Sequence, residues 1–291
     1  MDEQVRERVQ VFLSEVKQIP TLPDVYLRLQ KAFEDPWLSV EYISNIIRLD
    51  QTLTISILRL ANSPFFGFRK KISSITQAVM LIGLREVYSL VLSISVMGIF
   101  PLKEVDQGNL FPAKKLWEHC LAVGVASRVL GKMIGYAQPE ELFVAGLIHD
   151  IGKLVEKMYL GEKFVTVCQR SRDEERPFLE LEEEILGFTH AEVGEMLAEM
   201  WGFPALLVSI TAHHHHPEKL TEPKSADGAA IVHVADALVR AMGIGWGGDP
   251  FVPPIVPAAL ERLALITPSS LGSVLLKIRQ EYDTALRFLM H

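Results

Sequence analysis

The stretch AGLIHDIGKLV, residues 145–155, places a histidine and an aspartate side by side within an apolar run. A buried helix normally excludes an adjacent imidazole and carboxylate, because polar groups without partners lose their hydration in the protein interior. We therefore expect His149 and Asp150 to be paired or to bind a metal ion. Lys153 follows about one helical turn later, near enough to contact a ligand of the same site.

Further histidines and one aspartate lie on segments with the apolar periodicity of helices. His119 lies in KLWEHCLAVGVA, His190 in the first turn of THAEVG, and Asp236 among small and apolar residues in IVHVADALV. His214 and His215 are the central pair of the four-histidine run in TAHHHHPE. Imidazole and carboxylate ligands without thiolate suit Mn, Fe, Ni, Co or Zn, and they argue against a zinc finger.

The remaining histidines have more ordinary expected roles. His213 and His216 flank the central pair of the run and are expected to face water. His233 lies three residues before Asp236, where it either orients a ligand or packs in the core. A lone histidine on a helix is more often a satisfied polar residue than a ligand, so the prediction of a metal site rests on the combined pattern.

The chain has a helical pattern almost throughout, and no stretch alternates with a period of two between turn signals. This pattern predicts an all-α fold. The expected helices cover residues 5–16, 25–33, 40–49, 51–61, 72–83, 84–100, 113–133, 139–160, 162–172, 177–187, 189–201, 204–214 and 229–242, with two more at the C-terminal end.

Local signals mark the starts of several of these helices. Ser39 is expected to cap the helix that follows it, and Thr189 and Glu192 are expected to form a capping box. Thr21 is expected to cap the second helix, with Pro23 in its first turn.

One segment lacks helical periodicity and marks a boundary. Residues 101–112, PLKEVDQGNLFP, hold two prolines and a glycine. We therefore expect an N-terminal helical bundle lobe over residues 1–108 and a metal-site lobe over residues 109–291. A chain of 291 residues is long enough for two such units.

Composition limits the classes of partner. Hydrophobic residues make up 49% and charged residues 22% of the chain, and the net charge of −7 predicts no nucleic-acid partner. The longest apolar window, residues 87–102, is shorter than a membrane span, and the charged N-terminus is not a secretory signal. We therefore expect no membrane association, a cytoplasmic protein, and buried free thiols at Cys120 and Cys168.

The order of these polar residues resembles that of a known superfamily. His119, then His149–Asp150, then Asp236 is similar to the ligand order of the HD superfamily of metal-dependent phosphohydrolases, and HDIGK is similar to its central motif. The later histidines resemble the additional ligand set of its binuclear HD-GYP branch, and these are His190, His214 and His215.

A second similarity is more specific. The long stretch from IPTLPDVYLRLQ to LIGLREV is very similar to the N-terminal half of the HDOD domain, and THAEVGEMLAEMWGFP and HHHHPE agree with its second half. The chain is identified as a member of the HDOD family over residues 14–225. The resemblance implies an all-helical fold of two lobes and a signalling context in bacteria.

The resemblance also implies a ligand set. One divalent transition metal ion would take His119, His149, Asp150 and Asp236, and a second would take His190, His214 and His215, with Asp150 bridging. Asp150 and Lys153 would be catalytic, and Lys153 would bind phosphate. Many HDOD proteins lack these ligands and act as interaction modules, whereas this chain keeps every position. The HD-GYP branch has a GYP segment after its adjacent histidines, where this chain reads PEKLTEPKSADG, which argues against hydrolysis of cyclic di-GMP.

Three functions fit these observations. We favour a regulatory protein with a retained metal site, which acts by binding a protein partner in a signalling pathway or a small ligand. The alternative is a metal-dependent phosphohydrolase that acts on a nucleotide or cyclic nucleotide, a phosphate-containing small molecule. The third is an all-helical domain with polar groups in its core, which does not account for the complete ligand set.

Overall fold

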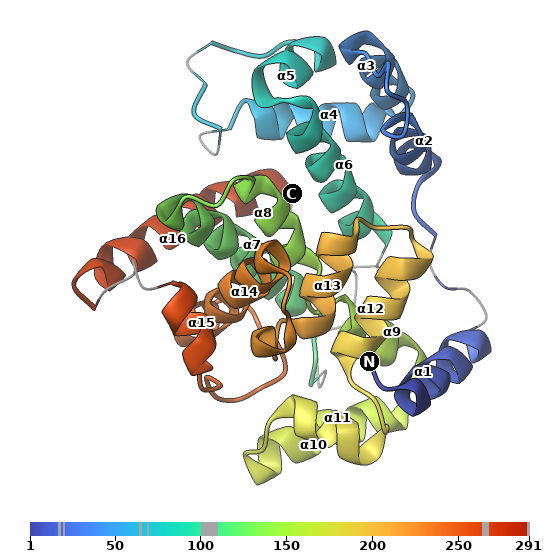
Figure 1. Cartoon of the computed structure of the whole chain (residues 1–291), viewed down its shortest axis with the longest axis vertical. Coiled ribbons are helices and arrows are strands. Elements are labelled where there is room, and N and C mark those ends of the chain that lie inside the picture. Colours follow the sequence, from blue (N-terminus) through green and yellow to red (C-terminus); the bar gives the residue numbers. More distant parts are fainter. Residues whose placement is uncertain are drawn as a thin grey trace. The chain divides into compact units, whose positions relative to one another are not determined.

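The computed structural model describes residues 1–16, 19, 21–63, 66–68, 70–99, 110–263 and 268–289. These residues form helices and connecting turns without a strand, which confirms the predicted all-α fold (Figure 1). The helices are α1 (Glu3–Glu15), α2 (Asp24–Ala32), α3 (Val40–Arg48), α4 (Gln51–Ala61), α5 (Ile75–Ile82), α6 (Leu84–Ile99), α7 (Ala113–Ile134), α8 (Pro139–Ile148), α9 (Ile151–Tyr159), α10 (Glu162–Glu174), α11 (Phe178–Ile185), α12 (His190–Met200), α13 (Ala205–His213), the 3₁₀ helix η1 (Pro217–Lys219), α14 (Pro223–Ala241), α15 (Pro257–Arg262) and α16 (Pro268–Leu289).

The chain divides into two compact units. Unit 1 comprises Met1–Ile19 and Pro101–Leu275, and unit 2 comprises Pro20–Phe100 and Leu276–His291. The predicted boundary between residues 108 and 109 lies outside the described residues. The division into lobes 1–108 and 109–291 therefore stays a prediction.

Most helix starts follow the predicted local signals. The Ser39 side chain accepts a hydrogen bond from the Tyr42 N–H at 3.1 Å, and the capping box of Thr189 and Glu192 is formed. The prediction for Thr21 was wrong. Helix α2 begins directly after Pro23 without a side-chain cap, so Thr21 lies two residues before the position that its hydroxyl would have to occupy.

The predicted helix over residues 139–160 was also wrong, because the structure has two helices there. Helix α8 ends at Ile148 and α9 begins at Ile151, and Asp150 between them leaves the helical conformation with φ −99° and ψ 16°. His149 and Asp150 therefore lie at a joint between helices. The turn at this joint, rather than a continuous helical repeat, fixes the spacing of the two side chains.

Glycines let the helices of unit 1 approach one another at the level of this joint. A Cβ atom at Gly124 of α7 would lie 2.6 Å from the Phe143 carbonyl oxygen of α8, and one at Gly146 of α8 would lie 2.8 Å from the backbone of Gly124. A Cβ atom at Gly152 of α9 would lie 2.0 Å from the carbonyl oxygen of His190 on α12. Close backbone contact between these helices thus requires glycine, and it brings histidine-bearing segments together.

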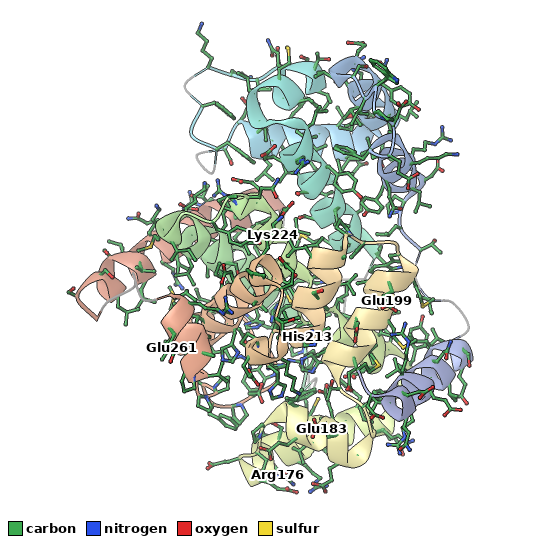
Figure 2. All side chains as sticks on the ribbon, viewed as in Figure 1. Arg176, Glu183, Glu199, His213, Lys224 and Glu261 are labelled. Atoms are coloured by element: carbon green, nitrogen blue, oxygen red, sulfur yellow. The ribbon has the colours of Figure 1, made fainter. Side chains whose placement is uncertain are left out.

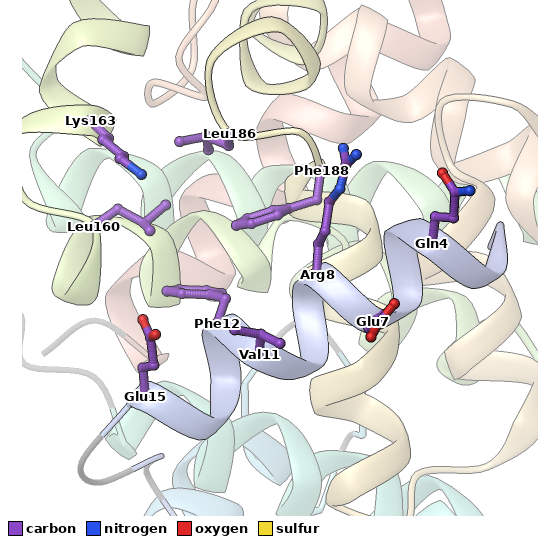
Figure 3. A pocket seen from close by; sticks show the side chains of 10 residues that line it. All are labelled: Gln4, Glu7, Arg8, Val11, Phe12, Glu15, Leu160, Lys163, Leu186 and Phe188. Carbon is purple, nitrogen blue, oxygen red and sulfur yellow. The ribbon is translucent and has the colours of Figure 1, made fainter.

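Helix α1 is held in unit 1 by an aromatic contact. Phe12 stacks on Phe188 with ring centroids 5.3 Å apart, and Arg8 donates a hydrogen bond to the carbonyl oxygen of Gly187 at 3.3 Å. A cavity of about 580 Å³ lies beside these side chains, and polar and charged residues of α1 line one wall of it (Figure 3). None of the predicted metal ligands lines this cavity.

Two expectations from composition can be compared with the described residues. Cys120 and Cys168 are buried free cysteines, as predicted. No described helix is by itself long and apolar enough to cross a bilayer. Only α5 and α6 taken together reach that length, and their axes are bent by 117°.

We predict that Gly152→Ala destabilises unit 1 by about 1–3 kcal/mol, because the new methyl group would overlap the His190 carbonyl and force α9 away from α12. Equilibrium denaturation in urea followed by circular dichroism measures the change. Gly272→Ala in α16 is the matched control, because nothing lies within 4 Å of the added Cβ atom there. The control is expected to be neutral or slightly stabilising. Equal free energies of unfolding for the two variants would contradict this account of the helix contact.

Candidate metal centre

Two histidines of the site have the same tautomer, set by the backbone. Nδ1 of His149 lies 2.7 Å from the carbonyl oxygen of Gly146, and Nδ1 of His214 lies 2.8 Å from that of Thr211. A carbonyl oxygen can only accept, so each Nδ1 carries the hydrogen and donates it. Nε2 of each ring is left as a lone-pair donor, which is the form that binds a metal ion.

His190 is oriented in a similar way by a carboxyl group. Nδ1 of His190 lies 2.6 Å from Oε2 of Glu182, which also accepts a hydrogen bond from the His190 backbone N–H at 3.2 Å. Nε2 of His190 lies 2.9 Å from Nε2 of His215 and 3.2 Å from Oδ1 of Asp150. Glu182 thus turns Nε2 of His190 toward the other polar groups of the site.

The two carboxylate oxygens of Asp150 face different histidines. Oδ2 lies 3.4 Å from Nε2 of His149 and 3.8 Å from Nε2 of His119. Oδ1 lies 3.2 Å from Nε2 of His190 and 3.7 Å from Nε2 of His214. We call His119 and His149 the first histidine set, and His190, His214 and His215 the second histidine set. One carboxylate therefore stands between two sets of imidazoles.

Asp236 adds a second carboxylate beside the first histidine set. Its Oδ1 lies 2.9 Å from Nε2 of His119 and 4.0 Å from Nε2 of His149. Arg240, one turn later on α14, donates from Nε to both oxygens of Asp236 at 2.8 and 3.0 Å. Sequence reasoning missed Arg240, although an aspartate and an arginine four residues apart on a helix are a recognisable pairing signal.

These groups meet the requirements of a metal site in their burial, and several of their donor atoms lack another partner. The ligand atoms of Asp150 and the second histidine set lie within 4.8 Å of one another, as do those of Asp150 and the first set. Among the described residues, several buried polar atoms have no hydrogen-bond partner: both ring nitrogens of His119, Nε2 of His149, Nε2 of His214 and Oδ1 of Asp150. Buried polar atoms are nearly always satisfied, so this concentration of unsatisfied donor atoms fits one or two divalent ions.

The ionisation of the cluster also fits a metal ion. Burial lowers the pKa of His149, lowers that of His190 to about 4, and lowers that of His214 well below its usual value. Burial alone would raise the pKa of Asp150, but His149 and Lys153 outweigh it and hold that pKa well below its usual range. At neutral pH the imidazoles of His149, His190 and His214 are uncharged, and the charge of Lys153 helps to keep the pKa of Asp150 low and its carboxylate ionised. These are the protonation states that metal ligands need.

Lys153 is fully buried and already has partners. Its Nζ donates to Oδ2 of Asp150 and to the carbonyl oxygen of Gly247, both at 2.8 Å, and lies over the Phe178 ring, 5.3 Å from its centroid. Asp150 raises the pKa of Lys153 against the opposing effect of burial, so the ammonium group keeps its charge. The predicted contact between Lys153 and a phosphate group stays a prediction.

The other histidines can now be placed. His233 donates from Nδ1 to the carbonyl oxygen of His214 at 2.9 Å and accepts at Nε2 from the Val256 N–H at 3.1 Å. His233 therefore fixes the backbone of His214, one of the predicted metal ligands. His213, at the end of α13 (Figure 2), contacts the Ser209 carbonyl oxygen at 3.0 Å and is partly exposed, and the His216 side chain is 45% exposed.

Two buried glutamates behind His190 were not found from the sequence. Burial raises the pKa of Glu156 to about 8 and, together with the charge of Glu156, raises that of Glu182 well above its usual value. Glu182 stands in the acidic run LELEEEI beside the exposed Glu183 (Figure 2), and local sequence does not distinguish the buried glutamate from the exposed one. The contact of Glu182 with His190, the first residue of α12, distinguishes the two glutamates.

Comparison with known protein families places the chain in one of them. A model of the HDOD domain matches residues 19–217, more than half of the chain. The chain belongs to the HDOD family. The predicted match over residues 14–225 is thereby confirmed, with the matched region shorter by five residues at its start and by eight at its end. Asp236 and Arg240 lie beyond the matched residues.

Relatives of this HDOD chain cover it to different extents. An HDOD domain protein of unknown function from Geobacter sulfurreducens is 25% identical, with a TM-score of 0.76 over 96% of this chain and 98% of its own. A structure from Marinobacter aquaeolei VT8, provisionally named a signal transduction protein, is 17% identical, with a TM-score of 0.75 over 98% of this chain and 66% of its own. An uncharacterized protein of Treponema pallidum (strain Nichols) is 28% identical over 202 residues, and the alignment spans 69% of this chain but only 38% of that protein.

We predict that Mn²⁺ raises the melting temperature of chelator-treated protein. A ligand at one hundred times its dissociation constant adds about 2.7 kcal/mol to stability. For a chain of 291 residues, whose entropy of unfolding is about 0.6 kcal/mol/K, that corresponds to roughly 4–5 °C, which calorimetry would detect. Asp150→Asn is expected to abolish the rise, because both histidine sets lose their shared carboxylate charge. His213→Ala should keep it, and an equal rise in both variants would contradict the assignment.

Proposed function

We propose that this HDOD protein is a metal-binding regulatory protein of a signalling pathway, which acts by binding a protein partner or a small ligand. The proposal rests on one observation: the site combines a complete set of ligand types with nearly complete burial. His149 and Asp150 are 0% exposed, and His119, His190 and His214 are each 1% exposed. Such a site is suited to holding ions permanently rather than to exchanging a large substrate.

The cavities next to the site are also too small for a large substrate. One of about 290 Å³ is lined by His213, His215 and His216, and one of about 160 Å³ is lined by His119 and Arg240. Sites for drug-sized ligands span roughly 300–1,000 Å³, so neither cavity offers ample room for a nucleotide. Small ions or small molecules fit them better.

A protein partner is supported by the surface of unit 2. Tyr42 and Leu49 are 52% and 66% exposed, and both line a cavity of about 710 Å³ together with the basic Arg28 and Lys31. Exposed apolar residues grouped beside charges are typical of protein interaction surfaces. The Marinobacter protein that shares this fold is named for signal transduction, which agrees with a signalling role.

A phosphohydrolase is the second candidate, favoured by the position of Asp150 between the two histidine sets. When bound, a pair of divalent ions lowers the pKa of a bound water and stabilises charge on a phosphoryl group. In that reaction Asp150 would join the two ligand sets, Glu182 would orient His190, and Lys153 would bind the phosphate of a nucleotide or cyclic nucleotide.

The first experiment measures metal content. Untagged protein purified without chelator is expected to contain one or two Mn, Fe, Ni, Co or Zn ions per chain by elemental analysis, and His149→Ala/Asp150→Ala is expected to contain none. His216→Ala is the control, because its side chain is 45% exposed and pairs with Glu218 at the surface. Wild-type protein that stays metal-free after reconstitution with Mn²⁺ or Fe²⁺ would refute a metal-binding function.

The same samples separate the two candidates. The metal-loaded protein is expected to leave a panel of phosphomonoesters and phosphodiesters, including cyclic nucleotides, unchanged. Turnover that is lost in the double variant and kept in His216→Ala would favour the phosphohydrolase instead. Pull-down with a unit 2 variant, Leu49→Glu, would then show whether partner binding depends on the exposed apolar surface.

We also predict that Glu182→Gln weakens metal affinity about 10- to 100-fold, the usual cost of losing a carboxylate that orients a ligating histidine. An amide can donate from its NH₂ group to Nδ1 of His190, which leaves the ring proton on Nε2 and removes the lone pair that would bind the ion. Competition with a fluorescent chelator measures the affinity. Glu183→Gln is the matched control, one residue away and exposed. Equal affinities in the two variants would argue against His190 as a ligand.

A further inference from the structure

A glycine-rich loop closes one side of the candidate metal centre. Residues 243–252, which we call the glycine loop, follow α14 and lie against α7, where the Trp246 N–H donates to the carbonyl oxygen of Lys115 at 2.9 Å. Beneath the loop is a cavity of about 160 Å³, lined by His119, Arg240 and all loop residues except Gly248. We call it the loop cavity.

At Gly245 the loop approaches the site so closely that only glycine fits. A Cβ atom at Gly245 would lie 2.2 Å from the backbone nitrogen of His119. A Cβ atom at Gly247 would lie 2.9 Å from Nη2 of Arg240 and 3.1 Å from Nε2 of His119. Gly247 is buried, and its N–H makes no hydrogen bond within the described part of the chain. Gly247 and the guanidinium group of Arg240 thus lie side by side next to His119.

Arg240 has one donor nitrogen without a partner. Its Nε donates to both oxygens of Asp236, and its Nη1 donates to Oδ2 of Asp249 at 2.6 Å. Nη2 is buried and has no partner among the described residues, and the Arg240 side chain is only 6% exposed to solvent. A buried charged donor that is left unsatisfied costs free energy, so a ligand with an acceptor atom at this point would relieve that cost.

The size of the loop cavity restricts the ligand. The loop cavity of about 160 Å³ has room for several water molecules or one small ion, and it lies below the range for drug-sized ligands. Arg240 and the free N–H of Gly247 are both donors, which an oxyanion satisfies with several oxygens at once. The chemistry and the volume together favour a small oxyanion such as inorganic phosphate or a short carboxylate.

The net charge of the groups near the cavity determines whether an anion can bind there. The charged groups at the cavity and directly behind it are two cations and three carboxylates: Arg240 and Asp249, which line it, and Lys153, Asp236 and Asp150. Without metal this group carries an excess of negative charge that repels an anion. One or two divalent ions at the histidine sets would reverse the sign and attract it.

We propose that the loop cavity is a binding site for a small oxyanion, which forms only when the metal centre is loaded. The inference rests on the proposed metal-binding function and gives it a small ligand. In this arrangement the oxyanion accepts hydrogen bonds from Nη2 of Arg240 and the N–H of Gly247. The metal centre and the glycine loop are connected through Lys153, which donates hydrogen bonds both to Asp150 and to the carbonyl oxygen of Gly247. Metal binding at Asp150 would therefore affect the loop that holds the oxyanion.

Isothermal titration calorimetry with inorganic phosphate, and separately with acetate, tests the proposal on the full chain. Metal-loaded wild-type protein is expected to bind phosphate at least about tenfold more tightly than metal-free protein, because the metal ions reverse the charge around the cavity. The same tenfold loss is expected for metal-loaded Gly247→Ala, because its methyl group would displace Nη2 of Arg240 and remove one charged hydrogen bond. Gly272→Ala is the matched control and should bind like wild type. Tighter binding of acetate than of phosphate would identify the oxyanion as a carboxylate and leave the site assigned.

A second pair of variants covers the case in which Gly247→Ala does not fold. Val252 lines the loop cavity and is 46% exposed, so its replacement leaves the core intact. At low ionic strength Val252→Glu is expected to weaken phosphate binding several-fold relative to Val252→Gln, because the added carboxylate repels the anion.

The outcomes separate this inference from the proposed function. Equal phosphate affinity in wild type, Gly247→Ala and Val252→Glu, with metal content unchanged, would place the anion elsewhere and overturn the oxyanion site while the metal-binding function stands. Absence of phosphate binding by metal-loaded wild type would mean that water alone fills the cavity, and would overturn the inference in the same way. Absence of metal in elemental analysis would refute the proposed function itself.

Discussion

The carboxylate of Asp150 is the group on which the centre of unit 1 depends. It is completely buried at the joint between α8 and α9, and each of its oxygens faces a different pair of histidine nitrogens. An ionised carboxylate in the interior is tolerated only when charges and hydrogen bonds compensate for its lost hydration. Lys153 compensates one oxygen, while Oδ1 has no hydrogen-bond partner among the described residues. The surrounding helices therefore pack around a negative charge that is only partly neutralised, and a cation bound next to Oδ1 of Asp150 would stabilise it.

Much of this arrangement could be predicted from the sequence because its signals are local. The adjacent pair His149–Asp150 stands out against the apolar residues before it, and the capping box at Thr189 depends only on residues three apart. The helical periodicity predicts the all-α fold for the same reason, since each turn repeats within a few residues. The structure brings the predicted ligands together from α7, α12, α14 and the ends of α8 and α13.

The parts that could not be predicted depend on contacts between distant segments. The break at Asp150 is absent from the apolar pattern, which runs on into α9 without a proline. Glu182 resembles its exposed neighbours until α12 covers it and presents His190. The glycine loop reads as a simple turn-rich linker, and its glycines acquire meaning only when His119 and Arg240 lie against them. In each case burial, which a single sequence does not encode locally, gives the residue its role.

Helix α14 has a consequence for how this protein can be divided. It begins at Pro223, six residues after the end of the HDOD match at residue 217, and it carries Asp236, Arg240 and His233. A recombinant fragment cut at the edge of the recognised domain would keep every predicted ligand except Asp236. It would also lose the histidine that holds the backbone of His214 and the arginine that holds Asp236. The smallest portion of the chain that preserves the whole centre is therefore larger than the domain by which the family is recognised.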